Sequence, residues 1–256
     1  DFFSRSLASL RCLSMAEGVG PLGGLRDDEL DAERASFSAG HKNFMAQVAS
    51  GALGFWKLPS QKDQLAQVRA VAQGLPDTLS DVLVLGIGGS SLGARAIYQA
   101  LSGPLELAGV LPRTHARLHF PDNSDPWLLA ALLDVLDPKA TVALCVSKSG
   151  GTVETAAQLL VIKRWLESAL SADEVRKRIV AITDPKAGSL REQATAEKWA
   201  TLPVPSNVGG RFSLLSAVGL LPALLGGAEI DALLDGAEYV QKKCETAELR
   251  ENPAGI

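Results

Sequence analysis

Short apolar runs alternate with helix-like segments along the chain from residue 81 onward. The run 81–87 is apolar at nearly every position and ends in glycines. Runs that are apolar throughout, rather than at every second position, are typical of strands in a parallel sheet with helices on both faces. We predict strands over 81–87, 117–120, 141–146, 178–183 and 199–204.

The segments between these runs carry apolar residues at three- and four-residue spacing, which predicts helices. Alternating strands and helices indicate an α/β fold, here a three-layer αβα sandwich with a five-stranded parallel sheet of the flavodoxin-like, doubly wound kind. Because crossovers between parallel strands are right-handed, the loops that follow the strands open onto one edge of the sheet. The predicted helices cover 92–101, 127–136, 153–170, 189–198, 214–225 and 230–249.

Residues 1–75 predict helices and no strand. Apolar residues near the start have the spacing of an amphipathic helix, which we favour over a transit peptide. An apolar connector over 51–59, bounded by glycine and proline, is expected to pack in the core. We therefore expect a helical extension over 1–75 and an α/β domain over 76–256. The helices of this extension are expected over 27–50 and 61–72.

The composition narrows the classes of partner. The apolar share of 46% and the mean hydropathy of +0.13 support a substantial buried core. A net charge of −4 and an aromatic share of 5% argue against nucleic-acid binding, which needs basic stripes or stacking platforms. No apolar run reaches the roughly 18 residues of a membrane helix.

The cysteines give no sign of a disulfide framework or a zinc site. Cys12, Cys145 and Cys244 are far apart and odd in number, and no Cys/His pair has metal-ligand spacing. Cys145 lies within an apolar run, so we expect a small core residue. This cysteine usage fits a reducing, cytoplasmic compartment.

The loop 147–152 is the first candidate for chemistry, because it follows a predicted strand and opens into a predicted helix. Its hydroxyls, the backbone N–H groups beside its glycines, a lysine and a helix N-terminus together suit a phosphate group. The alternative is structural: Ser149 or Thr152 caps the helix, and Glu154 interacts with the helix dipole.

Two further glycine-containing loops follow predicted strands. The loop 86–93 departs from the dinucleotide-binding spacing, and His119 and Phe120 stand where an acidic residue would end the second strand, so we expect no nicotinamide cofactor. A tight turn explains this loop equally well. In the loop 207–213, paired glycines precede Arg211, whose guanidinium could stabilise a developing oxyanion or could cap a surface turn.

Taken together and in this order, the three loops resemble the first half of the glucose-6-phosphate isomerase family, whose two halves are each a sugar-isomerase (SIS) domain. The Gly-Gly-Arg-Phe-Ser segment at 209–213 is the most specific of the three, and the resemblance covers residues 40–255.

This resemblance implies interconversion of glucose 6-phosphate and fructose 6-phosphate through an enediolate, with no metal or organic cofactor and with homodimers in the cytoplasm. It implies that Arg211 stabilises the enediolate. It implies that Gly89, Ser90 and Gly210 contact the substrate and that the phosphate is held by Ser147, Lys148, Ser149 and Thr152.

The family's general base is a glutamate in the second half, assisted by a histidine and a late lysine, and those segments have no counterpart here. His41, His115 and His119 do not match them, and we expect surface or turn positions for all three. We therefore expect that this chain is a fragment without turnover by itself. We also expect a second SIS domain beyond residue 256.

Three other functions stay open from the sequence. A noncatalytic SIS module that senses a phosphosugar would use the loop 147–152 but would have no need of Arg211. The other two are a dual phosphoglucose/phosphomannose isomerase and an isomerase fused to a second sugar-phosphate enzyme.

Overall fold

The computed structural model describes residues 26–103 and 114–255. The amphipathic helix expected at the start, and Cys12, lie outside the described residues. The described chain forms two compact units. One runs from Gly54 to Asp235 and contains the sheet, and the other joins the described residues through Leu53 with those from Gly236 onward.

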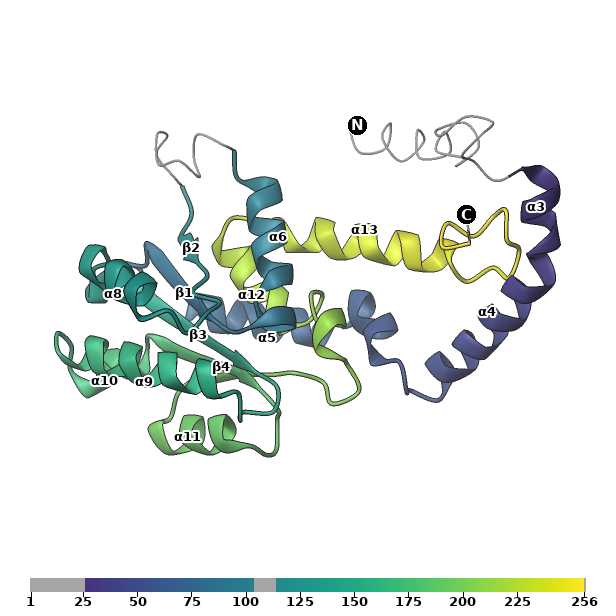
Figure 1. Ribbon diagram of the computed structural model, residues 1–256. Helices are drawn as coiled ribbons and strands as arrows, with labels where there is room; N and C mark the ends of the chain where they lie inside the picture. The colour runs from purple at the N-terminus through teal and green to yellow at the C-terminus, as the bar shows by residue number, and fades with distance from the viewer. Residues whose placement is uncertain (1–25, 104–113, 256) are drawn as a thin grey trace. The chain divides into compact units, whose positions relative to one another are not determined.

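All five strands predicted from the apolar runs are present and pair in parallel, which confirms the predicted α/β fold (Figure 1). Their order is β2-β1-β3-β4-β5, the order of flavodoxin-like sheets, and the chain changes direction of winding between β1 and β3. The strands are β1 (Asp81–Leu85), β2 (Arg117–His119), β3 (Thr141–Ser147), β4 (Ile179–Thr183) and β5 (Ala200–Pro203).

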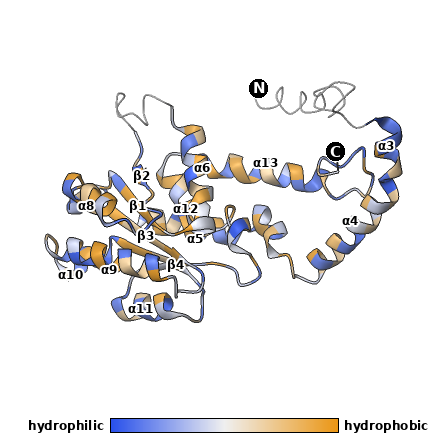
Figure 2. Ribbon diagram, viewed as in Figure 1, coloured by the Kyte–Doolittle hydropathy of each residue, from blue (hydrophilic) through white to orange (hydrophobic). Residues whose placement is uncertain are grey.

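Each face of the sheet is covered by helices, because most strand residues are apolar (Figure 2). Val142, Leu144 and Val146 of β3 face one core, while Ala143 and Cys145 face the other. The first core is closed by α5 (Lys62–Gln73), α6 (Leu92–Leu101) and α12 (Ala217–Leu225). The second is closed by α8 (Pro126–Val135), α9 (Val153–Glu167), α10 (Ala172–Arg176) and α11 (Ser189–Glu197).

Several helix boundaries differ from the prediction. The segment expected as one helix over 27–50 is α3 (Asp27–Ala32) followed by α4 (Arg34–Ala49). The helix expected from residue 214 begins later because the Ser216 hydroxyl caps it by accepting the N–H of Val218. The last helix, α13 (Ile230–Lys243), ends before residue 249, where Asn252 instead donates to the carbonyls of Cys244 and Thr246.

His41 and His119 are only partly exposed and make hydrogen bonds within the fold, which the sequence did not predict. His119 lies in β2 with its side chain only 21% exposed and hydrogen-bonds with Asp81 at 2.8 Å. His41 lies within α4 and hydrogen-bonds with the carbonyl of Cys244 at 2.9 Å. His115 is exposed, as expected.

Asp81, the first residue of β1, carries a buried carboxylate at the edge of the sheet opposite the glycine loops. Burial raises the pKa of this carboxyl, but hydrogen bonds from Arg117, Ser80 and His119 outweigh it and hold the pKa below its usual value. A lowered pKa stabilises the fold above the unfolded-state pKa, and that contribution is lost as the pH falls through the folded-state pKa.

We therefore expect Asp81→Asn to flatten the loss of stability below about pH 4. Urea unfolding between pH 3 and pH 7 measures this. The exposed Asp77→Asn is the matched control and should follow the wild-type curve. Parallel curves for Asp81→Asn and wild type across the whole range would contradict the expectation.

Candidate functional site

Three loops meet at the carboxyl-terminal edge of the sheet, and they follow β1, β3 and β5. The first two strands are neighbours at the point where the winding reverses. In open α/β sheets this switch point is where ligands bind, because the flanking loops diverge and leave a crevice. The loops singled out in the sequence therefore stand at the expected place.

The loop 147–152 gathers its hydroxyl groups. The Ser147 and Thr152 oxygens lie 3.2 Å apart, and the Ser149 hydroxyl accepts the N–H of Gly151 at 3.3 Å. Gly150 has φ +70, and a Cβ there would lie 2.9 Å from the backbone nitrogen of Leu190. Glycine is therefore required at 150 for the loop to turn tightly against the start of α11.

None of these hydroxyls caps the N-terminus of α9. Thr152 occupies the N-cap position, but its side chain accepts no hydrogen bond from the first turn, and the Ser149 hydroxyl is engaged with Gly151. In contrast, the Asp125 carboxylate caps α8 by accepting the N–H of Trp127 at 2.9 Å. The capping alternative for Ser149 and Thr152 is therefore wrong, and the first N–H groups of α9 are available to an anion.

The loops after β1 and β5 touch through their backbones. A Cβ on Gly89 would lie 2.4 Å from the carbonyl group of Gly210 and 2.9 Å from the nitrogen of Arg211. The Ser213 hydroxyl donates to the Gly210 carbonyl at 2.7 Å. The structure thus brings together Gly89, Gly210 and Arg211, three of the residues that the sequence singled out, with Ser90 in the same short helical turn as Gly89.

Arg211 lies in the short 3₁₀ turn η5 (Gly210–Phe212) and is exposed. Across residues 26–103 and 114–255 we find no hydrogen bond or ion pair to its guanidinium. A cation that is not already neutralised can be used by a negatively charged group of a ligand.

The connector at 51–59 packs in the core and also supports the loop after β5 that carries Arg211, which we call the Arg211 loop. Sequence reasoning missed this second role. Leu58 is buried, but the N–H of Gly54 donates to the carbonyl of Asn207 at 3.1 Å. Phe55 stacks on Phe212 with 5.0 Å between the ring centres. The aromatic residue in each segment was the only signal in the sequence.

Lys148 occupies an unexpected position for a residue of the phosphate loop. Its ammonium group donates to the carbonyl oxygens of Ser206 at 2.7 Å and Val208 at 2.8 Å. The side chain therefore joins the loop after β3 to the loop after β5.

Gln158 of α9 makes a similar connection on the other side, and no pattern in the sequence pointed to it. Its amide nitrogen donates to the carbonyls of Pro121 at 2.5 Å and Asn123 at 2.9 Å. Arg95 of α6 pairs with Asp122 in the same loop at 3.1 Å. The loop after β2 is thus tied to α6 and α9, the helices that begin at the loops 86–93 and 147–152.

Cys145 has no part in chemistry at this edge. Burial raises the pKa of its thiol to about 12, so the thiolate needed for a nucleophile or metal ligand is not formed near neutral pH. This agrees with the expected core role. No helix of the described residues combines the length and apolar character that a membrane crossing needs.

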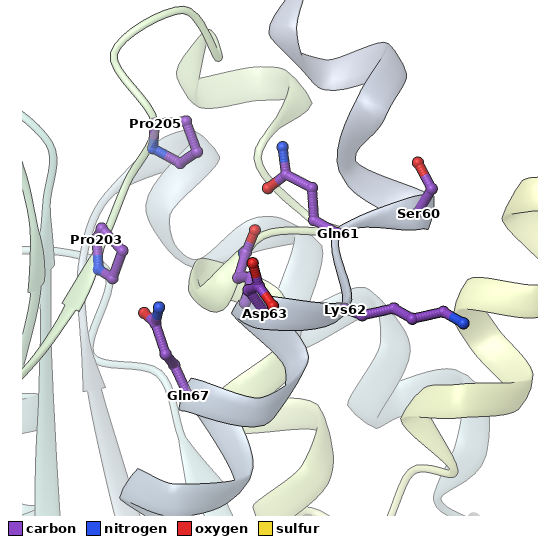
Figure 3. A pocket seen from close by; sticks show the side chains of 8 residues that line it. Ser60, Gln61, Lys62, Asp63, Gln67, Pro203 and Pro205 are labelled. Atoms are coloured by element: carbon purple, nitrogen blue, oxygen red, sulfur yellow. The ribbon is translucent and has the colours of Figure 1, made fainter.

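A pocket of about 540 Å³ lies between the start of α5 and the end of β5 and contains none of the predicted site residues (Figure 3). In Figure 3 Gln67 extends toward Pro203, whereas Lys62 extends away from the two prolines. The lining also includes Gln64, which is 7% exposed and whose two amide atoms are buried without a hydrogen-bond partner in the part of the chain described.

Because a buried amide without partners costs about 1–3 kcal/mol, we expect Gln64→Leu to raise the free energy of unfolding by about 1 kcal/mol. Chemical denaturation measures the change. The exposed Gln67→Leu, one turn along α5, is the matched control and should stay within about 0.5 kcal/mol of wild type. A destabilised Gln64→Leu protein would show that the amide is hydrogen-bonded, for instance to an ordered water.

Comparison with known proteins identifies the family. The sequence pattern that defines the family described as "Phosphoglucose isomerase" matches residues 60–254. A glucose-6-phosphate isomerase of Rubrobacter xylanophilus is 43% identical over 194 residues, which make up 75% of this chain and 44% of that protein. A glucose-6-phosphate isomerase of Carboxydothermus hydrogenoformans is 37% identical over 235 residues, 91% of this chain and 50% of that protein.

Solved structures agree. A hypothetical protein from Thermus thermophilus superposes with a TM-score of 0.77 at 35% identity, over 88% of this chain and 52% of that one. A glucose-6-phosphate isomerase from Chlamydia trachomatis gives a TM-score of 0.60 at 28% identity, over 76% of this chain and 35% of that one. The chain spans about half the length of the curated relatives it matches. With the family pattern covering most of its length, the chain belongs to the phosphoglucose isomerase family.

Proposed function

We propose that this chain is the N-terminal part of a glucose-6-phosphate isomerase that interconverts D-glucose 6-phosphate and D-fructose 6-phosphate through an enediolate. One observation carries the proposal. The uncapped start of α9, with Ser147, Ser149 and Thr152 around it, lies at the same sheet edge as the contact between Gly89 and the Arg211 loop. A site for an anion and a guanidinium without a partner in the described chain are thus available to the two ends of one phosphosugar.

In this proposal the phosphate binds the N–H groups of α9 and the hydroxyls of the loop 147–152. Gly89, Ser90 and Gly210 allow the sugar to approach the backbone. Arg211 stabilises the negative charge that develops on the oxygens at C1 and C2 when a proton leaves. The resemblance to the family implies that the general base is a glutamate in a second SIS domain beyond residue 256. Within this chain, Cys145 stays protonated and His41 and His119 are engaged in structural hydrogen bonds, so we assign the base to none of them.

The proposal extends to the organisation of the protein. It takes residues 1–75 as a helical extension and 76–256 as the first SIS domain, with a homodimer as the assembled state and the cytoplasm as its location. The resemblance to the family implies that no metal or organic cofactor takes part, and the proposal assigns the positive charge at the reacting carbons to the guanidinium of Arg211.

The test is an isomerisation assay on the protein at its natural length, with fructose 6-phosphate detected by a coupled enzyme. We expect turnover of glucose 6-phosphate and none of unphosphorylated glucose. Turnover of mannose 6-phosphate as well would assign the dual specificity. Binding of glucose 6-phosphate without any turnover would replace the proposal by a noncatalytic phosphosugar sensor.

A further inference from the structure

The strongest feature that the family resemblance leaves unexplained is the position of the Lys148 ammonium group. The resemblance assigns this lysine to the phosphate, together with its neighbours in the loop 147–152. In the structure its nitrogen lies 2.7 Å from the carbonyl oxygen of Ser206 and 2.8 Å from that of Val208. Two of its three N–H donors are therefore committed to the loop that carries Arg211.

We propose that Lys148 is a positioning residue, which acts on the reacting end of the substrate by holding the Arg211 loop, and that its side chain is not a ligand of the phosphate. This inference rests on the proposed isomerase function. Within the loop 147–152, the hydroxyls and backbone N–H groups bind the phosphate of the substrate, and the lysine positions Arg211 at the reacting carbons.

Three successive carbonyl groups of the Arg211 loop show how much depends on the lysine. Those of Ser206 and Val208 accept from Lys148, and the one between them, on Asn207, accepts from the N–H of Gly54. Hydrogen bonds from an ammonium group are stronger than neutral ones. Removal of the lysine leaves two of these three carbonyls without their donor, three to five residues before Arg211.

Two other contacts support the Arg211 loop from the opposite side of the arginine. Phe55 stacks on Phe212, and Ser213 donates to the Gly210 carbonyl. These contacts hold the turn that contains Arg211 but not the approach to it, which is where the lysine acts. A guanidinium displaced by about 1 Å loses much of its effect on a transition state, of the order of 100-fold.

The experiment compares Lys148→Met with wild type in the protein at its natural length. We expect kcat to fall about 10- to 100-fold while KM for glucose 6-phosphate stays within about threefold. Inorganic phosphate, used as a competitive inhibitor, reports on the phosphate site alone, and its Ki should also stay within about threefold. Lys186→Met, an exposed lysine in the loop after β4 at the same sheet edge, is the matched control and should leave all three constants unchanged.

Two further variants separate positioning from a general loss of structure. Lys148→Arg keeps N–H donors and a charge, so it should recover most of kcat. In an Arg211→Met background, Lys148→Met should lower kcat by less than about a further threefold, because the effects of two residues that act as one unit are not additive. If Lys148→Met does not fold, Lys148→Gln replaces it in the same comparisons.

The outcomes are distinct. A Ki for phosphate raised tenfold or more with kcat retained would make Lys148 a phosphate ligand and overturn the inference. Losses that multiply in the double variant would overturn it as well, since the lysine would then act independently of Arg211. Absence of turnover in the wild-type protein would instead overturn the proposed function, and with it any role in isomerisation for either residue.

Discussion

Arg211→Ala in the protein at its natural length is expected to lower kcat about 100- to 1,000-fold, the range found when one donor to a developing oxyanion is removed. The guanidinium is exposed at the sheet edge, and within the described chain nothing neutralises it. Its whole charge is therefore available in the transition state, whereas the ground-state sugar carries no negative charge at C1 or C2. We expect KM to change much less than kcat.

Steady-state assays in both reaction directions measure this effect. Arg176→Ala, at an exposed position of α10 where the arginine forms a surface ion pair with Asp173, is the matched control and should behave as wild type. A fall in kcat of less than tenfold, about 1.4 kcal/mol, would remove Arg211 from the role assigned to it.

The second large effect is expected at Gly89. Alanine at 89 places a methyl group 2.4 Å from the Gly210 carbonyl, a distance that a carbon atom cannot adopt. Because the colliding group is backbone, the two loops must separate, and Arg211 moves with its loop. We expect kcat/KM to fall at least about 100-fold and the free energy of unfolding to drop by about 1–3 kcal/mol.

Gly103→Ala is the control for this substitution, because a Cβ at 103 would meet no atom of the described residues within 4 Å. Activity assays and urea unfolding on the same preparations separate the effect on the site from that on the fold. If Gly89→Ala kept activity within about threefold of wild type, the backbone contact between the two loops would have no functional importance.

The sequence predicted those parts of the site that depend on strand ends. Ser147 and Thr152 are brought together because they flank one tight turn. The apolar run before them is typical of a buried parallel strand, which is what the structure shows. Once the sheet is parallel, the loops after β1 and β3 share an edge whatever their sequences are. Local composition and sheet topology were therefore sufficient to predict the turn at 147–152 and its place beside the loop after β1.

The parts that could not be predicted are contacts between residues far apart in the chain. No periodicity relates Lys148 to the carbonyl of Ser206, and the sequence favoured a phosphate group as the partner of the lysine. The pairing of Phe55 with Phe212 depends on how the connector before α5 turns. His119 lies in a predicted strand, but nothing in the sequence relates it to Asp81, which opens a different strand.

Lys148 and Gln158 share a property that bears on how the family can vary. Each projects from the unit formed by β3 and α9, and each holds a neighbouring loop by two carbonyl oxygens rather than by side chains. Every amino acid supplies a carbonyl, so Asn123 and Ser206, both exposed, can be replaced without loss of these bonds. Substitutions can therefore accumulate at these two positions while the loops keep their place at the edge of the sheet.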